Sequence, residues 1–462
     1  MVVQLGAARL TDEQIAPLRE GVRGTVISPG EDGYDNARRV WNGMIDRHPA
    51  LIVQCAGVAD VMAAVRFAAD HELPIAVRGG GHNVAGTAVA DGALVVDLSR
   101  MKGVRIDPVS RTAWVEGGVT WAELDHETQA FGLATTGGTV SMTGVGGLTL
   151  GGGIGWLMRA HGLACDNLLA ADVVTVDGQL RTASATEHAD LFWGLRGGGG
   201  NFGVVTAFTF RLHPVPSTIM AGPIFYPLAA GRDVLRMYRD VAPTLPDEAI
   251  CHFGMLTSPE GVQMVALLPA YIGSLEDGAE ALKPLRGFGS PAADLLGPMP
   301  YQAVQQMFDA GFPSGVRNYW KAGLLQSLDD EAIDGLIERF AGTPSPRNLV
   351  LIEQLGAAVG RQAAGDTAFA HRSAPYNAII AAAWDDPGDD GANIAWARSL
   401  WAGLEPSSPG GVYVNYLGTA DLEGSNRIRA AYGPNYERLV ELKRAYDPEN
   451  RFRSNQNIAP TA

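Results

Sequence analysis

The stretch that decides the fold reads IAVRGGGHNVAG and spans residues 75–86. Its first residues, Ile75-Ala76-Val77, predict a short buried strand, and the glycines after them predict a tight loop that carries His82. Upstream, the apolar run 50–53 predicts a second strand, and the apolar periodicity of 58–68 predicts a helix between the two strands. This part of the chain therefore predicts a compact β-α-β unit that ends in a glycine-rich loop.

Glycine is the strongest compositional signal, with 58 residues that are most concentrated before residue 204. Further clusters lie at 143–155 and 197–203. Glycine allows close approach of the backbone to a ligand and tolerates positive φ angles. Backbone N–H groups in such turns form concavities that bind anions. Several such turns in one domain predict a long, phosphate-bearing cofactor of the nucleotide type.

The last glycine cluster also matches the spacing of a dinucleotide-binding Rossmann site. Gly198, Gly200 and Gly203 fit the G-x-G-x-x-G pattern, which requires a helix directly after it. Residues 204–210 instead predict a strand, so the match is interpreted as fortuitous. No P-loop sequence occurs either, and the glycine turns therefore favour neither a nicotinamide site nor a nucleoside triphosphate site.

Composition and charge limit the possible partners. The 462 residues carry a formal net charge of −15, which disfavours non-specific nucleic-acid binding because that needs clustered Lys and Arg. The three cysteines, Cys55, Cys165 and Cys251, have no metal-binding spacing, so buried thiols and no metal are expected. The sequence has no run of about 18 apolar residues and no signal-peptide pattern, so we expect no membrane partner and a cytoplasmic location.

The composition of the sequence changes after Pro214 and Pro216, where glycine becomes less frequent. The predicted strands of this part are 221–226, 250–256, 262–268, 349–357, 376–384 and 411–416. Its predicted helices are 229–241, 274–284, 329–341, 392–403 and 433–446. The fold class is therefore α+β, with a second domain that has an antiparallel sheet and helices on one face.

Residues 77–86 resemble the flavinylation loop of the vanillyl-alcohol-oxidase superfamily, whose members have a PCMH-type FAD-binding domain. More narrowly, the chain resembles the berberine-bridge-enzyme-like FAD-linked oxidases over about residues 40–459. The other segments that carry the resemblance follow in the family's order: Val96–Ser99, Gly146–Gly153, His161–Leu163, Asp166-Asn167, Asp190–Trp193, Gly200–Thr206, Tyr413–Tyr416 and Phe452–Ile458.

The resemblance implies three parts of the chain. Residues 1–215 would form a two-subdomain FAD-binding domain with its core at about 43–215. Residues 216–415 would form the substrate domain, and residues 416–462 would return to the FAD domain.

The resemblance also implies a covalent bond between His82 and the flavin of FAD. A neutral imidazole is a good nucleophile near pH 7, and the alternative is a histidine that only hydrogen-bonds within its loop. Some relatives have a second bond from a cysteine, but Val140 stands at the matching position and Cys165 lies well past it. We therefore expect a single covalent link.

The remaining site expectations also follow from the resemblance. Tyr416 is the candidate catalytic base and Tyr413 a cofactor contact, although a regular strand at 411–416 would point them to opposite faces. The alternative is that both are core aromatics. The expected cofactor-binding residues are Arg78, Gly79, Gly80, Gly81, His82, Asn83, Gly86, Thr143, Gly146, Gly147, Gly152, Gly153, Val204, Val205, Tyr413 and Asn455.

Other polar residues are weaker candidates. His161 is expected to be structural, Glu353 and Gln354 are candidates for substrate contact, and His371-Arg372 is expected at the surface.

Together these features predict an FAD-dependent oxidase that removes a hydride from a small organic alcohol, amine or secondary-metabolite intermediate and passes the electrons to O₂. The alternatives are a dehydrogenase with another acceptor and a flavin-binding protein without turnover. The protein is expected to be a monomer or a homodimer.

Overall fold

The computed structural model describes residues 10–418 and 425–461. Its first sheet has the strand order β1-β2-β4-β3, and β2 and β3 are both parallel to β4. The strands are β1 (Thr25–Ile27), β2 (Leu51–Gln54), β3 (Ile75–Arg78) and β4 (Leu94–Asp97). The helices of this part are α1 (Asp12–Gly21), α2 (Tyr34–Ala37) and α3 (Val58–Asp70). The predicted β-α-β unit is thus β2-α3-β3, and the loop after β3 carries His82.

The second sheet is antiparallel, with the order β5-β6-β10-β8-β9. The strands are β5 (Val104–Asp107), β6 (Thr112–Glu116), β8 (Leu168–Val174), β9 (Leu180–Ser184) and β10 (Val204–Arg211), beside a short pair of β7 (Leu133–Ala134) and β11 (His213–Pro214). The helices are α4 (Trp121–Gln129), α5 (Val145–Leu150), α6 (Met158–His161), α7 (Ala189–Leu195) and the 3₁₀ turn η1 (Ala164–Asn167). Residues 204–211 form a strand and not a helix, which confirms that the G-x-G-x-x-G match at 198–203 is not a Rossmann site.

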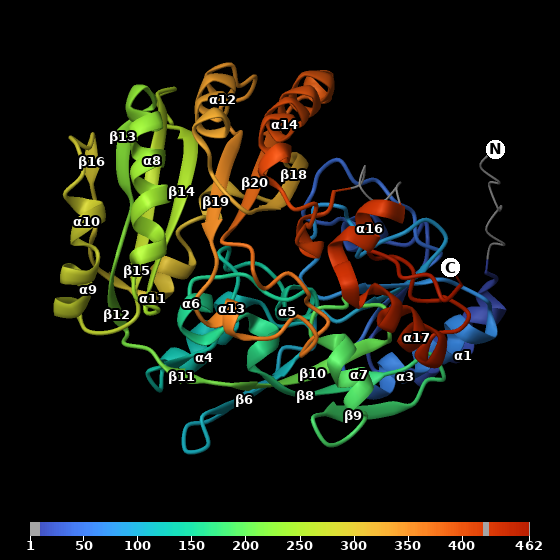
Figure 1. Cartoon of the computed structure of the whole chain (residues 1–462). Helices are drawn as coiled ribbons and strands as arrows, with labels where there is room; N and C mark the ends of the chain where they lie inside the picture. The colour runs from blue at the N-terminus through green and yellow to red at the C-terminus, as the bar shows by residue number, and fades with distance from the viewer. Residues whose placement is uncertain (1–9, 419–424, 462) are drawn as a thin grey trace.

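A third sheet forms a separate layer, seen at the upper left of Figure 1. Its main path is β16-β13-β15-β14-β19-β20-β18, every pair is antiparallel, and β12 pairs with β15 and β17. The strands are β12 (Thr218–Ala221), β13 (Ile224–Pro227), β14 (Ala249–Thr257), β15 (Gln263–Tyr271), β16 (Ala293–Asp294), β17 (Gly297–Pro300), β18 (Arg317–Leu325), β19 (Leu349–Gln354) and β20 (Tyr376–Trp384).

Three long helices cover one face of this sheet, namely α8 (Gly231–Val241), α12 (Asp330–Ala341) and α14 (Asp390–Leu404). The opposite face packs against residues of the first two sheets' domain, among them Trp41, Ile154 and Trp156. The remaining helices are α9 (Leu275–Ala281), α10 (Lys283–Arg286), α11 (Tyr301–Gln305) and α13 (Ala358–Arg361), with 3₁₀ turns η2 (Leu228–Ala230), η3 (Ala242–Thr244), η4 (Asp309–Gly311), η5 (Pro387–Asp389) and η6 (Glu405–Ser407). The expected antiparallel domain with helices on one face is confirmed.

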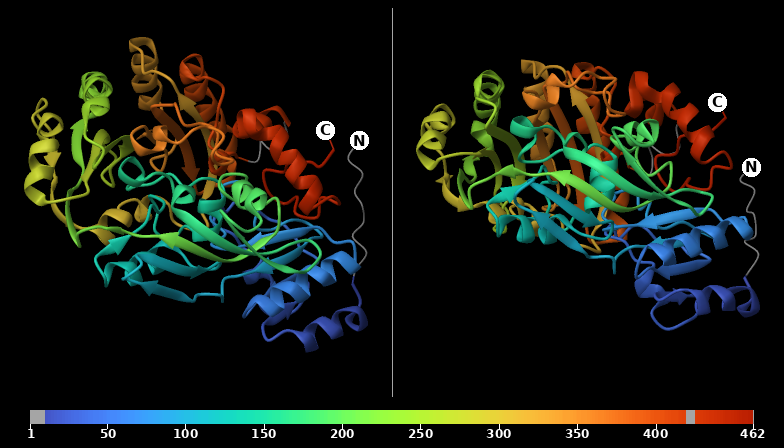
Figure 2. Two further views of the ribbon diagram at one scale, coloured as in Figure 1. Left: turned by 60° about the horizontal axis from the view of Figure 1, so that its bottom comes forward. Right: turned by 90° about the horizontal axis from the view of Figure 1, so that it is seen from below.

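The C-terminal helices lie against the N-terminal half of the chain, as the views of Figure 2 show in red. They are α16 (Ser425–Tyr432) and α17 (Tyr436–Tyr446), joined by the turn η8 (Gly433–Asn435), and α17 packs on α7. The fully buried Lys443 donates hydrogen bonds to the carbonyls of Asn201 and Phe452 and pairs with Asp447. This lysine ties the tail of the chain to the last glycine cluster.

Two predicted strands differ from the structure, and one observed strand was not predicted. The strand 221–226 is divided into β12 and β13 by Gly222-Pro223, where Gly222 has φ +135°. The strand β18 was not predicted, because its two faces are both largely buried and the sequence therefore shows no alternation. Residues 411–416 are not a strand, since Val414–Tyr416 form the 3₁₀ turn η7.

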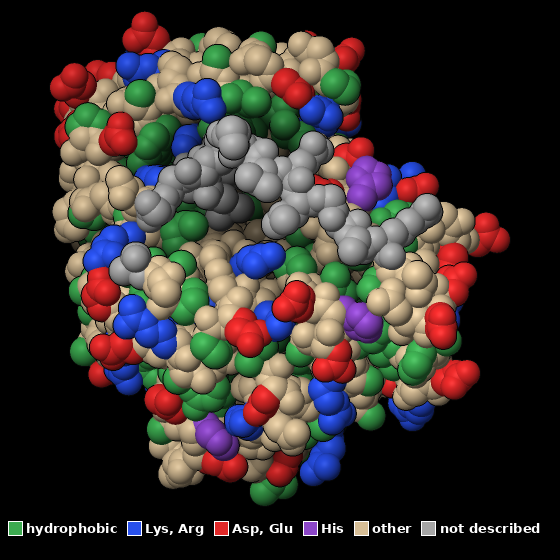
Figure 3. Space-filling view, turned by 90° about the vertical axis from the view of Figure 1, so that its right-hand side faces the viewer, with side chains coloured by type: hydrophobic (Ala, Val, Ile, Leu, Met, Phe, Trp, Pro, Cys, Tyr) green, Lys and Arg blue, Asp and Glu red, His purple; other side chains and the backbone are tan. Residues whose placement is uncertain are grey.

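Two further observations concern membrane-spanning helices and the charge of the surface. In residues 10–418 and 425–461, no helix is long and apolar enough to cross a membrane. On the face seen in Figure 3, the acidic and basic side chains of the described residues are interspersed.

Candidate functional site

A cavity lies between the glycine-rich loops and the third sheet. Its walls come from the loop after β3, the second and third glycine clusters, the strands β18, β19 and β20, the turn η7 and the C-terminal tail. The cavity therefore connects the glycine turns, whose backbone N–H groups can bind a phosphate-bearing cofactor, with the third sheet.

Most of the residues expected from the sequence meet at this cavity. Those that line it are Gly79, Gly80, Gly81, His82, Asn83, Thr143, Gly146, Gly147, Val205, Tyr413, Tyr416 and Asn455. The expected residues that do not line it are Arg78, Gly86, Gly152, Gly153 and Val204.

Three of these five residues make contacts that hold the loops around the cavity. Arg78 donates a hydrogen bond to the carbonyl of Ala37, and Gly86 packs so closely that a Cβ atom would lie 2.5 Å from the side chain of Ile45. The N–H of Gly153 donates to the hydroxyl of Tyr413 at 2.9 Å. The sequence resemblance selects both kinds of residue, since a family pattern reflects the shape of a loop as well as direct contacts.

His82 lies at the cavity wall with one face of its ring covered by Trp41. The two ring centroids are 4.5 Å apart and the planes are inclined by 19°. Burial lowers the pKa of His82 to about 4, against the opposing effect of Asp309, so the imidazole is neutral at pH 7. Its Nε2 atom is buried and has no hydrogen-bond partner among the described residues. A neutral histidine with a free ring nitrogen is the state that a nucleophile requires.

The glycine loop after β3 makes a close backbone contact with the second cluster. A Cβ atom on Gly80 would lie 2.5 Å from the backbone nitrogen of Gly144, and a Cβ on Gly144 would lie 2.4 Å from that of Gly80. Real Cβ atoms do not approach so closely. Both positions therefore require glycine, and their contact holds backbone N–H groups at the cavity wall.

The C-terminal tail closes the other end of the cavity. The amide of Asn455 donates to the carbonyls of Gly200 and Phe452, while its Oδ1 atom is buried and has no partner in the described part of the chain. The same holds for the Nε2 atom of Gln456. Buried polar atoms are normally hydrogen-bonded, so these atoms and His82 Nε2 fit a polar ligand along this wall, such as FAD.

Tyr416 lines the cavity, and its hydroxyl is hydrogen-bonded to the carboxylate of Glu353, which is fully buried behind the lining. The hydroxyl of Tyr416 donates to Glu353 Oε1 at 3.0 Å, and Asn377 Nδ2 donates to Glu353 Oε2 at 2.7 Å. Desolvation raises the pKa of Glu353 to about 7 and that of Tyr416 well above its usual value. A tyrosine that donates to a carboxylate can pass a proton to it, so the pair can accept a proton from a bound molecule.

The turn η7 changes the expectation for Tyr413 and Tyr416. Because residues 414–416 turn instead of extending, both side chains reach the cavity, and their ring centroids are 4.8 Å apart in an edge contact. The hydroxyl of Tyr413 accepts hydrogen bonds from the Gly153 N–H and the Asn415 amide. The segment thus binds the second glycine cluster and does not join a sheet, which is the physical reason for the wrong strand prediction.

An apolar and aromatic wall faces the cavity from the third sheet and the turn after η4. The residues are Phe312, Trp320, Leu351 and Ile379. The ring of Trp320 makes edge contacts with Trp41, Phe312 and Tyr416, all at centroid distances of 5.7–5.8 Å. No motif in the sequence marks this wall, because its members are ordinary core residues of separate segments.

The other candidates lie outside the cavity lining. Gln354 points to the helix-covered side, where it bonds to the backbone of Cys251 and Ala242. His161 stacks on His213 with the ring centroids 3.9 Å apart. Val140 lines the cavity, whereas the thiol of Cys165 is fully buried elsewhere and its pKa is raised by burial.

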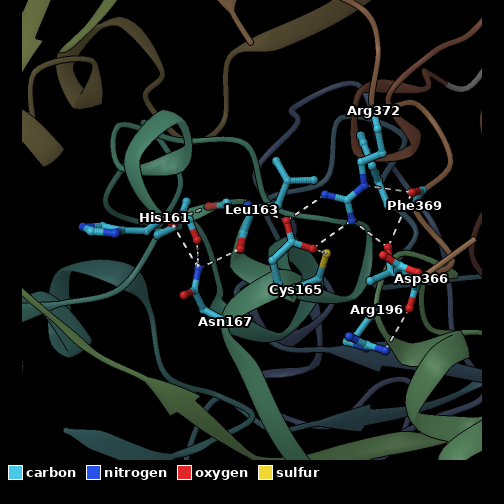
Figure 4. Close-up of polar contacts among 12 residues, drawn as sticks. His161, Leu163, Cys165, Asn167, Arg196, Asp366, Phe369 and Arg372 are labelled. Carbon is cyan, nitrogen blue, oxygen red and sulfur yellow. Dashed lines mark hydrogen bonds and ion pairs between the residues drawn. The ribbon is translucent and has the colours of Figure 1, made fainter. Parts of the chain in front are cut away.

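Figure 4 shows the polar network around Arg372 behind the cavity. Arg372 donates to both oxygens of Asp166, at 2.7 and 2.8 Å, and each side chain is only 4% exposed. It also donates to the carbonyl of Phe369, whose ring packs against Gly152. The surface position expected for His371-Arg372 is wrong for Arg372, since a bidentate carboxylate makes a buried guanidinium tolerable.

Comparison with known proteins connects this geometry to a family. A family model described as "FAD binding domain" matches residues 49–184, and one described as "Berberine and berberine like" matches residues 412–459. An FAD-linked oxidoreductase of Dictyostelium discoideum is 33% identical over 460 residues, which are 98% of each chain. The chain belongs to the berberine-bridge-type FAD-linked oxidoreductases.

A further relative and a solved structure are similar to the chain along nearly its whole length. The (R)-6-hydroxynicotine oxidase of Paenarthrobacter nicotinovorans is 33% identical over 95% of this chain and 97% of its own. The crystal structure of 6-hydroxy-D-nicotine oxidase from Arthrobacter nicotinovorans superposes with a TM-score of 0.87 at 30% identity, covering 95% of this chain and 98% of that one. The protein is therefore an FAD-dependent oxidoreductase with the fold of the PCMH-type oxidases.

Proposed function

We propose that this oxidoreductase binds FAD through a single covalent bond to His82 and oxidises a small organic amine or alcohol, with O₂ as the electron acceptor. The observation that carries the proposal is the neutral imidazole of His82, whose Nε2 atom is buried and unpartnered among the described residues, in a glycine-lined cavity that Tyr416 also lines. Imidazole, polar tail and proton acceptor thus share one space.

The residues that would hold FAD follow from the cavity walls. The backbone of Gly79–Asn83 would bind the pyrophosphate, as glycine-rich turns bind anions. Val205 and the tail residues Asn455 and Gln456 would contact other parts of the cofactor. When bound, FAD supplies a two-electron acceptor that takes a hydride from the substrate.

A single link is favoured by the residues near the loop. Val140 lines the cavity but has no nucleophilic atom. Cys165 does not line the cavity, and burial keeps its thiol protonated because it raises the pKa. Of the residues considered for attachment, His82 is the one with a nucleophilic atom at the wall.

The base role of Tyr416 is refined by its partner Glu353. A phenolate at Tyr416 would be costly, since desolvation raises the pKa of the hydroxyl well above its usual value. The Tyr416 hydroxyl can instead accept the substrate's proton while it gives its own proton to Glu353. Glu353, with a pKa of about 7, is a suitable final acceptor near neutral pH.

The wall of Phe312, Trp320, Leu351 and Ile379 supports a compact, largely apolar substrate. Aromatic rings bind planar or cationic groups through their faces, whereas an oligosaccharide needs many polar partners. One similar protein oxidises (R)-6-hydroxynicotine, as its name states. We therefore propose a small amine or alcohol that carries an apolar or aromatic part.

The test is a panel of small amines, alcohols and sugars with the purified holoprotein. A substrate should bleach the flavin absorbance without oxygen, and admission of air should restore the absorbance and release peroxide. Bleaching that air does not reverse within minutes would instead identify a dehydrogenase that uses another acceptor. No bleaching by any amine or alcohol, with bleaching by a sugar, would contradict the substrate class.

The expected assembly and location stay predictions. Size-exclusion chromatography with light scattering should give the mass of a monomer or a homodimer, and any larger mass would contradict this. The cytoplasmic location rests on the sequence pattern alone and is tested by fractionation of the source cells.

A further inference from the structure

Trp41 lies outside every glycine cluster and yet covers the ring of His82. Its side chain is 4% exposed, and its indole is nearly parallel to the imidazole. An imidazole that lies flat on an indole cannot turn about its Cβ–Cγ bond without losing that contact. The contact therefore fixes the plane in which the two ring nitrogens lie.

Three hydrogen bonds hold Trp41 in place. Its backbone N–H donates to the carbonyl of Gly81 at 3.0 Å, directly beside His82. Its indole Nε1 donates to the carbonyl of Phe312 at 2.8 Å, and its own carbonyl accepts from the N–H of Gly315 at 2.8 Å. One bond thus joins Trp41 to the histidine loop and two join it to the substrate domain.

The two residues after Trp41 also join the histidine loop to the substrate domain. The amide of Asn42 donates to the carbonyls of Val84 and Asn318 at 2.7 and 2.9 Å, and its oxygen accepts from the N–H of Asn318. The N–H of Gly43 donates to the carbonyl of Val316. Residues 41–43, here called the bridge segment, therefore join both sides of His82 to the third-sheet domain.

We propose that Trp41 is a positioning residue for covalent flavin attachment: its indole holds the His82 imidazole in the orientation for bond formation, and the bridge segment sets that orientation through the docked substrate domain. This inference rests on the covalent link proposed above.

The attachment reaction explains why orientation matters. A bond forms between an imidazole nitrogen and the carbon of the flavin 8-methyl group. One hydrogen is lost from the imidazole nitrogen and one from the methyl group. The flavin is left reduced by two electrons and two protons, which O₂ then takes up as H₂O₂. The nitrogen lone pair must point at the methyl carbon, and misplacement by about 1 Å can cost roughly a hundredfold in rate.

Trp41 also keeps water from the imidazole. Burial lowers the pKa of His82 to about 4, and Asp309, the charged group that acts on it from η4, only opposes this. Without the indole, the pKa is expected to rise toward the unperturbed value of about 6.5. A protonated imidazole has no lone pair for attack, so attachment would then become slow below that pH.

The experiment compares full-length Trp41→Phe, which keeps a ring, with Trp41→Met, which keeps bulk without a ring. The matched control is Trp193→Met, because Trp193 is also 4% exposed and its Nε1 also donates to a backbone carbonyl at 2.8 Å, that of Gly365. For each protein, the flavin-free chain is mixed with FAD at pH 8 and at pH 5.5, and the flavin that stays with acid-precipitated chain, divided by the total bound flavin, is followed over time. Unfolded molecules do not enter this ratio.

Trp41→Met should show at least about a tenfold slower attachment at pH 8, with a further loss at pH 5.5 that the wild type does not show. Trp41→Phe should stay near the wild type, as should Trp193→Met. Wild-type attachment in Trp41→Met at both pH values would overturn the proposal. Equal losses in Trp41→Phe and Trp41→Met, or in Trp193→Met, would do the same.

The wild-type measurement distinguishes failure of the proposed covalent bond at His82 from failure of the proposed role of Trp41. A wild type whose flavin is fully released by acid contradicts the covalent bond at His82, and with it this inference. A wild type that retains its flavin beside a fully flavinylated Trp41→Met contradicts only the role of Trp41.

Discussion

At the scale of single residues, the chemistry of the site depends on pairs that lie far apart in sequence. Tyr416 is 63 positions from its partner Glu353, and Trp41 stacks on a histidine in a different loop. In each pair, one member has a recognisable sequence context and the other does not. In the function we propose, each pair has a chemical property that neither side chain has alone: the first pair accepts a proton, and the second holds a nucleophile in place.

The Tyr416–Glu353 pair predicts both a rate and a pH dependence. Tyr416→Phe should slow flavin reduction by substrate by roughly 10²–10⁴-fold. Glu353 accepts a proton only when ionised, so the wild-type reduction rate should rise with pH and reach half its maximum near the Glu353 pKa of about 7. Glu353→Gln should be slow and should lack this step. Stopped-flow reduction without oxygen measures both, and a Tyr416→Phe enzyme as fast as the wild type would exclude the relay.

At the scale of elements, loops and turns position the site more than the regular strands do. The strand β3 delivers the loop of His82, and the turn η7 places Tyr413 and Tyr416 side by side. Gly80 and Gly144 press two glycine clusters together. The contact of Gly80 with Gly144 is between backbones, which explains why glycine patterns carried so much of the sequence signal.

The contact of the two clusters gives a prediction for Gly80→Ala. The added Cβ would lie 2.5 Å from a backbone nitrogen of Gly144, so the loops must separate. We expect a loss of bound FAD of at least about tenfold. Gly365→Ala, where no atom lies within 4 Å of the added Cβ, should bind FAD as the wild type does. Flavin content per chain, from absorbance, measures this; an unchanged content in Gly80→Ala would contradict the close contact.

A buried acid between α4 and α11 gives a prediction for stability. Desolvation raises the pKa of Asp125 to about 7, while Gln305 donates to it at 2.9 Å. The unfolded chain ionises this group above pH 4 and the folded protein only near 7, so stability falls as the pH rises through that window. Asp125→Asn removes a penalty on the order of 4 kcal/mol at pH 8 and none at pH 4.

Chemical denaturation at the two pH values checks the Asp125→Asn prediction. Asp125→Asn should raise the free energy of unfolding more at pH 8 than at pH 4. An equal change at both pH values would mean that folding does not raise the pKa of Asp125.

At the scale of the whole molecule, the site is the junction of three parts of the chain. The glycine loops, the third sheet and the C-terminal tail each supply one wall, and Figure 1 shows the tail's helices lying against the N-terminal half. Local periodicity and glycine turns were sufficient for the α+β class and for β2-α3-β3. The family resemblance supplied most of the cavity-lining residues expected around the cofactor.

The remaining parts of the site depend on packing that no local pattern records. The strand β18, which carries Trp320, is buried on both faces and shows no alternation. The segment 411–416 turns because Tyr413 is hydrogen-bonded to Gly153 of the second glycine cluster, which lies 260 positions away in the sequence. Arg372 is buried only because Asp166 neutralises it. Each of these features becomes visible when distant segments meet.

The most direct test of covalent flavin attachment at His82 is the mass of the denatured protein. Wild type, unfolded in acid and freed of loose ligand, should have the mass of the chain plus one FAD, with the flavin on the peptide that contains His82. His82→Ala should have the mass of the chain alone and should release its flavin into the supernatant. A wild-type chain without added mass, or flavin attached at Cys165 or any residue other than His82, would contradict the central claim.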